Sequence, residues 1–157
     1  MVEFRAMARA EYEKWRRASV KNYADENVAS GRWTKEESES RSERDFADLL
    51  PDGMETRDNY LRTIVDESSS ERVGTIWYAV RRDEGREYVF IYDFEILDEH
   101  RRKGYGTDTL KHLDGVVRGM GLNLISLHVF AHNGAARSLY EKVGYEEKDI
   151  IMSKDLP

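Results

Sequence analysis

The stretch Arg101-Arg102-Lys103-Gly104-Tyr105-Gly106-Thr107 decides the fold, because the pattern of the chain changes there from strand to helix. A strand-like run from Tyr88 to Leu97 precedes it, and a helical run that ends near Met120 follows it. The first backbone N–H groups of a helix have no partner inside it, and they carry the positive end of its dipole. Glycine lets a ligand approach such a backbone closely. The stretch therefore predicts a phosphate-binding loop.

Two familiar nucleotide-binding motifs are excluded at this loop. A dinucleotide fingerprint needs a third glycine at the position of Thr109, and a P-loop has its lysine after the glycines, whereas Lys103 precedes them. A plain strand-to-helix connection with arginines facing solvent remains the simpler alternative. The loop alone does not identify a ligand.

A second motif lies about thirty residues further on, and it runs Asn133-Gly134-Ala135-Ala136-Arg137-Ser138-Leu139-Tyr140-Glu141-Lys142-Val143-Gly144-Tyr145. Together the two motifs resemble the GNAT superfamily of acyl-CoA-dependent N-acetyltransferases. The family's Arg/Gln-x-x-Gly-x-Gly/Ala loop is matched by Arg101, Gly104 and Gly106. Its Asn-x-x-Ala-x-x-Leu-Tyr-x-x-x-Gly-Phe pattern is matched throughout, with Tyr145 in place of phenylalanine. The runs 90–94 and 126–133 also resemble a bacterial YycN-like branch.

The resemblance covers roughly residues 72–155 and implies an α/β (α+β) fold. We expect one domain over residues 1–157, with acceptor-side helices in 1–58 and an acetyl-CoA-binding core in 72–155. The family fold is a mixed, mostly antiparallel central sheet with helices on both faces. In it, the strands that match Glu87–Leu97 and Asn123–Phe130 splay apart, and the pantetheine arm lies between them.

Composition limits the other classes of function. Twenty-five basic and thirty-one acidic residues give a net charge of −6, which argues against a general nucleic-acid binder. The chain has no cysteine, so a thiol nucleophile and a thiolate metal site are excluded. No apolar run approaches the ~20 residues of a membrane span, and the N-terminus lacks a signal-peptide pattern. We therefore expect a cytoplasmic protein without a membrane or nucleic-acid partner.

The N-terminal third predicts a short strand and two helices. Val2 to Ala6 suits a first strand, and Tyr12, Trp15, Ser19 and Tyr23 share one face of a helix over Arg9–Ser30. These aromatic residues are either core or the wall of an acceptor pocket. Thr34 and Glu37 have the spacing of a capping box, so a second helix should begin at Lys35.

The rest of the chain alternates strands and helices. The predicted strands are Tyr60–Asp66, Arg72–Arg82, Glu87–Leu97, Asn123–Phe130 and Glu146–Lys154. Because Glu87–Leu97 is nearly all apolar or aromatic, we expect it to be buried on both faces. The two predicted helices are Gly104–Met120 and Asn133–Val143, and Gly144 should end the second.

The resemblance also implies the site residues. Backbone N–H groups of the loop would bind the pyrophosphate of acetyl-CoA, a backbone N–H near Ile96 would polarise the thioester carbonyl, and Asn133 would contact the CoA arm or cap its helix. The expected cofactor-binding residues are Phe94, Ile96, Arg101, Arg102, Lys103, Gly104, Tyr105, Gly106, Thr107, Asn133, Ala136 and Tyr140. No metal is expected.

Tyr140 is the expected general acid. A thiol has a pKa of about 8.5 and a phenol about 10, so the phenol is protonated at neutral pH and can give its proton to a departing thiolate. The alternative is a core tyrosine on an amphipathic helix.

Asp93 and Glu95 are the expected general base. They lie two residues apart on a strand, so their side chains point to the same face. Carboxylates in an apolar strand are costly unless solvated or paired, so at least one should line a cleft, unless both pair with arginines. His100, His128 and His132 are alternatives by pKa alone.

The leading functional hypothesis is transfer of an acetyl group from acetyl-CoA to a primary amine. The alternatives are a non-catalytic acyl-CoA-binding sensor and a nucleic-acid module that uses Arg101, Arg102 and Lys103. The amine could belong to a protein, a peptide or a small molecule. Dimers are common in this superfamily, so a homodimer is one assembly state that the resemblance allows.

Overall fold

All 157 residues are described in the computed structural model. The elements in chain order are β1 (Val2–Ala6), α1 (Arg9–Ala29), α2 (Lys35–Leu49), the 3₁₀ turn η1 (Gly53–Glu55), β2 (Asn59–Asp66), β3 (Arg72–Asp83), β4 (Arg86–Ile96), the 3₁₀ turn η2 (Asp98–His100), α3 (Tyr105–Gly119), β5 (Ile125–Leu127) and α4 (Gly134–Lys142).

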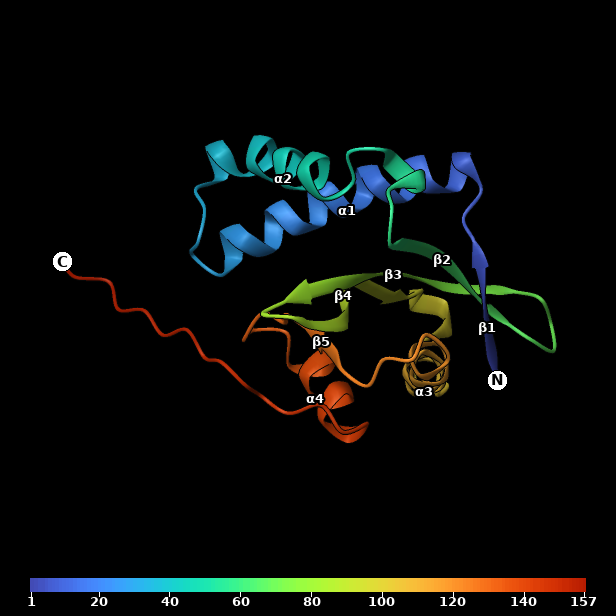
Figure 1. Ribbon diagram of the computed structural model, residues 1–157. Helices are drawn as coiled ribbons and strands as arrows, with labels where there is room; N and C mark the ends of the chain where they lie inside the picture. Colours follow the sequence, from blue (N-terminus) through green and yellow to red (C-terminus); the bar gives the residue numbers. More distant parts are fainter.

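The strands form a single sheet in the order β1-β2-β3-β4-β5. The first four strands pair antiparallel with their neighbours, and β5 alone runs parallel to β4. Figure 1 shows α1 and α2 on one face of this sheet and α3 and α4 on the other. The predicted mixed, mostly antiparallel sheet with helices on both faces is therefore confirmed. No helix is long and apolar enough to cross a membrane.

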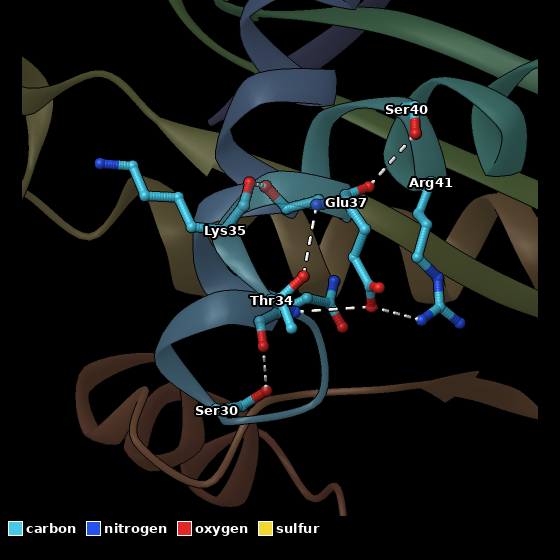
Figure 2. Close-up of polar contacts among 8 residues, drawn as sticks. Ser30, Thr34, Lys35, Glu37, Ser40 and Arg41 are labelled. Atoms are coloured by element: carbon cyan, nitrogen blue, oxygen red, sulfur yellow. Dashed lines mark hydrogen bonds and ion pairs between the residues drawn. The ribbon is translucent and has the colours of Figure 1, made fainter.

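The start of α2 shows how local sequence sets a helix boundary. The Thr34 hydroxyl accepts a hydrogen bond from the Glu37 amide at 3.3 Å, and the Glu37 carboxylate accepts one from the Thr34 amide at 3.5 Å (Figure 2). Arg41 then pairs with Glu37 at 2.8 Å, one helical turn further on. These bonds satisfy N–H groups that a helix start otherwise leaves unpaired, so the predicted capping box is confirmed.

The two faces of the sheet are covered by different side chains. On the α3 side lies a mainly aliphatic cluster: Val2, Ile64, Val73, Ile76, Tyr78, Val89, Ile91, Leu110, Leu113 and Val117. On the α1 and α2 side lies an aromatic-rich cluster: Met7, Tyr12, Trp15, Val20, Phe46, Leu50, Leu61 and Trp77. The predicted core role of the α1 aromatics is confirmed for Tyr12 and Trp15, while Tyr23 packs against the rim of the second cluster.

Three predictions about strands are wrong. β4 is not buried on both faces, because only Val89 and Ile91 are fully buried along it. β5 has three residues instead of the expected Asn123–Phe130, and residues 146–154 form no strand. An alternating apolar pattern shows that a segment can form a β-strand. The strand forms only where the free edge of another strand is available to pair with it. Within this chain, residues 146–154 lie against no such edge, and they run outward from α4 (Figure 1).

Candidate active site

The site lies where β4 and β5 stop pairing. Their ladder ends at the pair Ile91 and Leu127, although β4 continues to Ile96. On the other edge of β4, Leu97 N–H donates to the Val73 carbonyl at 2.9 Å. Because hydrogen-bonded pairs alternate along an antiparallel ladder, the backbone groups of Phe94 and Ile96 point away from β3, toward the open side. The expected carbonyl-polarising N–H near Ile96 therefore points toward this open edge.

A β-bulge sets the direction of the side chains that follow it. Trp77 pairs with Asp93 and Tyr78 with Ile91, so Tyr92 is an extra residue in β4. Tyr92 stacks on Trp77 with ring centroids 4.6 Å apart. Both Tyr92 and Asp93 therefore lie on the α1 and α2 side of the sheet. The bulge brings a carboxylate onto the aromatic-rich face.

Asp93 is held there by α1. The Trp15 indole Nε1–H donates a hydrogen bond to the Asp93 carboxylate at 3.0 Å. Although part of the residue reaches the surface, its carboxyl is enclosed by protein, and this burial raises its pKa to about 6. The Trp15 bond opposes the shift, and the charges of Glu95 and Glu26 add to it. A carboxyl with this pKa is ionised at neutral pH and can accept a proton.

Glu95 has a different environment from Asp93. It pairs with Thr75, two residues from the Trp77 and Asp93 pair, so both carboxylates share one face of the sheet. The Glu95 carboxylate is about half exposed and lies 3.7 Å from the Arg101 guanidinium. Of the two candidates, Asp93 has the buried setting of a catalytic base. Glu95 instead pairs with an arginine, which is the alternative role that the sequence left open for both carboxylates.

Tyr140 approaches this region from α4. Its ring packs against the aliphatic cluster and meets Tyr145 at 5.6 Å between ring centroids. Burial, followed by the negative charges of Asp93 and Glu26, raises the pKa of Tyr140 to about 12. The phenol is therefore a protonated donor at any physiological pH, close enough to Asp93 to respond to its charge.

Glu26 was missed by sequence reasoning. It lies on α1, where burial raises its pKa, and its charge acts on both Asp93 and Tyr140. A signal for it existed: it comes three residues after Tyr23 and so continues the helix face of Tyr12 and Trp15. A carboxylate on the aromatic face of a helix is unusual. Glu26 is the α1 carboxylate whose charge acts on both Asp93 and Tyr140.

The loop before α3 presents a row of unpaired amides. Arg102 and Gly104 have φ values of 62° and 88°, and these left-handed conformations turn the chain into the helix. No backbone N–H from Arg102 to Thr107 has an acceptor in the protein, and no side chain caps α3. This array suits an anion such as a diphosphate.

The side chains of the loop have structural partners of their own. The Arg101 Nε–H donates to the Ile96 carbonyl at 2.9 Å, and its guanidinium also pairs with Asp98 at 2.9 Å. The Tyr105 hydroxyl donates to Asp66 at 2.7 Å, and the bonds that Asp66 accepts lower its pKa. Tyr105 therefore has only its backbone available for a cofactor, while Arg102 and Lys103 stay exposed.

Gly106 and the start of α4 tie the two motifs together. A Cβ atom on Gly106 would lie 2.9 Å from Leu139 Cδ2, so glycine there lets α3 pack against α4. Asn133 caps α4, because its side-chain oxygen accepts from the Ala136 amide at 3.4 Å. The capping role of Asn133 is observed, and its side-chain NH₂ forms no bond that would prevent it from contacting a cofactor.

Each of the three histidines considered as alternative bases packs against an aromatic ring. His100 is buried against Tyr105, with its Nε2 3.5 Å from Glu71. His132 stacks on Phe130, and His128, whose pKa is lowered by burial, meets the edge of the same ring. No group of three or more His, Asp or Glu residues is placed to hold a metal ion.

The chain is similar to proteins of the acetyltransferase (GNAT) family over nearly its whole length. The model of the acetyltransferase (GNAT) family matches residues 12–145. Two Bacillus subtilis (strain 168) proteins described as uncharacterized N-acetyltransferases are similar over 150 residues. YycN is 39% identical, with 96% of each chain covered, and YdgE is 35% identical, with 96% of this chain and 95% of YdgE covered.

Solved structures agree with this relationship. The crystal structure of YycN superposes with a TM-score of 0.93 at 37% identity and covers 100% of this chain and 99% of its own. Glucosamine-6-phosphate N-acetyltransferase from Arabidopsis thaliana shares the fold, with a TM-score of 0.53 at 19% identity and coverage of 100% of this chain and 99% of its own. With two sequence motifs, this sheet and these matches in agreement, the chain belongs to the GNAT acetyltransferase family.

Proposed function

We propose that this protein transfers an acetyl group from acetyl-CoA to a primary amine, by direct transfer in a ternary complex. The observation that carries the proposal is the enclosed carboxyl of Asp93, which the Trp15 indole holds and whose charge acts on the phenol of Tyr140. Asp93 and Tyr140 come from β4 and α4, and the charge of the carboxylate contributes to the raised pKa of the phenol. A proton acceptor and a proton donor thus lie within electrostatic range of each other.

The amides from Arg102 to Thr107 suit the diphosphate of the coenzyme. The exposed side chains of Arg102 and Lys103 add positive charge beside them. From that position, the thioester arm would extend along the open edge of β4, where the Ile96 N–H is available to its carbonyl oxygen.

The reaction needs two proton transfers in opposite directions. As the amine nitrogen bonds to the carbonyl carbon, Asp93 accepts the proton that the nitrogen loses. As the carbon–sulfur bond breaks, Tyr140 gives its proton to the sulfur. Protonation of Asp93 removes a negative charge that raises the pKa of Tyr140. The phenol therefore becomes a stronger acid at the stage when the leaving group needs a proton.

The direct test is release of free CoA thiol from acetyl-CoA in the presence of a panel of amines, with calorimetry of acetyl-CoA binding alongside. The panel should include peptides with a free N-terminus, peptides with an internal lysine, and polyamines. We expect binding, with thiol release that depends on the amine. Binding without amine-dependent release would instead support an acyl-CoA-binding sensor.

The coenzyme site has its own test in the Thr107→Pro variant. Proline in the first turn of a helix removes an N–H group with little cost to the helix. A hydrogen bond to a charged partner contributes about 1.5–3 kcal/mol, so acetyl-CoA affinity should fall roughly 10- to 150-fold. Thr107→Ala keeps the N–H and is the matched control. Equal affinities in the two variants would remove this amide from the proposed site.

A further inference from the structure

The amides that suit a diphosphate lie in a segment with little support of its own. No backbone N–H from Arg102 to Thr107 has an acceptor in the protein. Arg102 and Gly104 adopt left-handed conformations, and residues 101–104 belong to no helix or strand. A segment with few hydrogen bonds opens easily, and every residue that must be ordered on binding costs affinity. Contacts from outside the segment must therefore hold these amides in place.

The residues on either side of this segment contact a single turn, the β2–β3 turn (residues 66–71). Tyr105, the first residue of α3, donates a hydrogen bond from its hydroxyl to Asp66 Oδ2 at 2.7 Å. His100, the last residue of η2, places its Nε2 3.5 Å from Glu71 Oε1. The rings of His100 and Tyr105 also meet edge to face, with centroids 5.9 Å apart. Both ends of the segment are thus attached to a turn that lies much earlier in the chain.

The β2–β3 turn is itself held by a network of hydrogen bonds. Asp66 Oδ1 accepts from the Ser68 amide at 2.8 Å, the Ser68 hydroxyl at 2.6 Å and the Ser69 amide at 3.1 Å. The Asp66 amide donates to the Glu71 carbonyl at 2.9 Å, which closes the turn. The bonds from Ser68 and then from Tyr105 hold the pKa of Asp66 far below its usual range, so the carboxylate stays charged at physiological pH. One carboxylate oxygen therefore shapes the turn, and the other holds α3.

We propose that Asp66 and Tyr105 are positioning residues for the coenzyme, because their hydrogen bond holds the first turn of α3 with its amides already directed at the diphosphate. The Tyr105 hydroxyl is occupied by Asp66, so it acts on the coenzyme only through the backbone that it holds. A site whose donors are fixed before binding loses less conformational entropy when the ligand arrives. The inference rests on the proposed coenzyme site and involves neither Asp93 nor Tyr140.

The simpler role for this bond is stability of the fold alone. The Tyr105 ring packs against the aliphatic cluster, and a hydrogen bond to a charged partner stabilises a folded protein. The two roles differ in what they predict for a variant that remains folded. A bond that serves only stability leaves the coenzyme affinity of the folded protein unchanged, whereas a positioning bond lowers that affinity when it is removed.

The first test is the Tyr105→Phe variant, which keeps the ring and removes the hydroxyl. Calorimetry should show acetyl-CoA affinity reduced roughly 3- to 30-fold, the range typical of changes that act through a neighbouring network. The KM for acetyl-CoA should rise, while kcat at saturating coenzyme should stay unchanged, because Asp93 and Tyr140 are intact. Tyr60 packs against the same aliphatic cluster, so Tyr60→Phe is the matched control and should bind as the wild type does. Circular dichroism checks that both variants are folded.

A double-mutant cycle tests whether Tyr105 acts through Asp66. Asp66→Ala removes the acceptor, so Tyr105→Phe should then cause no further loss of acetyl-CoA affinity. An equal loss in both backgrounds would show that Asp66 has no part in the effect. If Asp66→Ala does not fold, Tyr105→Phe decides the proposal alone.

A second measurement examines the amides without any coenzyme. Nitrogen-15 relaxation of Gly104 and Gly106 reports their motion, and order parameters of about 0.85 mark a rigid backbone. We expect values near this level in the wild type and in Tyr60→Phe, and clearly lower values in Tyr105→Phe. This readout does not depend on acetyl transfer or on coenzyme binding.

Each outcome decides the proposal. Weaker coenzyme binding together with more mobile amides in Tyr105→Phe, both absent from Tyr60→Phe, supports the positioning role. Unchanged affinity in Tyr105→Phe, beside a wild type that binds acetyl-CoA, overturns this role and leaves the proposed function standing. Weaker binding with unchanged amide motion also overturns it, because the hydroxyl would then act by another route. A wild type that does not bind acetyl-CoA overturns the proposed function, and the coenzyme role of Asp66 and Tyr105 with it.

Discussion

The two faces of this sheet bury side chains for different purposes. The aliphatic cluster under α3 contains no carboxylate or other charged group. The aromatic-rich cluster under α1 and α2 includes Trp15, whose indole holds the buried Asp93. Burying a charge costs free energy that burying a methyl group does not. The aliphatic face therefore stabilises the fold, while the aromatic-rich face also encloses a destabilising carboxyl, which we propose as the catalytic base.

The largest expected effect on turnover comes from Tyr140→Phe, although the Tyr140 ring packs against the aliphatic cluster, because the charge of Asp93 on the other face acts on its phenol. Loss of a positioned proton donor typically costs ~10²–10⁴ in rate, while the missing hydroxyl leaves the coenzyme contacts in place. We expect thiol release to fall by that factor and acetyl-CoA binding, measured by calorimetry, to stay within about twofold, which is well under one hydrogen bond. Tyr145→Phe removes a neighbouring hydroxyl and is the matched control. Turnover retained in Tyr140→Phe would refute the assignment.

The largest effect on the structural side is expected for Leu113→Ala. Leu113 is fully buried in the aliphatic cluster, so its truncation should leave a cavity and cost about 2–5 kcal/mol of unfolding free energy. Urea denaturation measures this loss. At temperatures where Leu113→Ala is still folded, its turnover should equal that of the wild type. A marked change in turnover without loss of stability would show that the two faces are not separate in function.

Asp93→Asn should affect stability and activity in opposite directions. A buried carboxyl with a pKa of about 6 is destabilising when ionised, so the amide should raise the unfolding free energy at pH 7 by about 1–3 kcal/mol. Because the pKa of Asp93 is higher in the folded state than in the unfolded state, ionisation of this carboxyl opposes folding, and the uncharged amide removes that cost. The gain should be complete above pH 6 and become small near pH 4, where the wild-type carboxyl is protonated in the folded state and about half protonated in the unfolded state.

The turnover of Asp93→Asn should fall strongly. The rise in rate that the wild type shows as pH increases past 6 should be absent from this variant. Denaturation curves at pH 4 and pH 7, set beside pH–rate profiles, measure both effects. Destabilisation of Asp93→Asn at pH 7 would mean that the carboxylate is favourably paired and does not carry a burial cost.

The smallest effect is expected for Glu26→Gln. The charge of Glu26 raises the pKa of Asp93, so its removal should lower that pKa and move the acid limb of the rate profile to lower pH by less than about one unit. Glu43→Gln removes an exposed α2 carboxylate and serves as the control. If the acid limb of the pH–rate profile stays at the same pH in Glu26→Gln, the charge of Glu26 does not act on the catalytic base.

Much of the fold could be predicted from local patterns. Periodicity located the helices and most strands to within a residue or two, and the capping box placed the start of α2 at Lys35. The strand predictions failed at β5 and at residues 146–154, where the outcome depends on a neighbouring edge. For the site, spacing alone put Asp93 and Glu95 on one face of β4. It could not show which of them is enclosed by protein, nor that Glu26 approaches from α1.

The sequence by itself determined the order of the elements up to α4 and the membership of the family, because both depend on residues close together in the chain. It also predicted a phosphate-binding loop before α3. Only the tertiary structure decided which carboxyl is enclosed by protein and on which phenol its charge acts. It also showed an apolar C-terminus without cover. These properties arise from contacts between segments far apart in the chain, and a pKa depends on everything that surrounds a group in space.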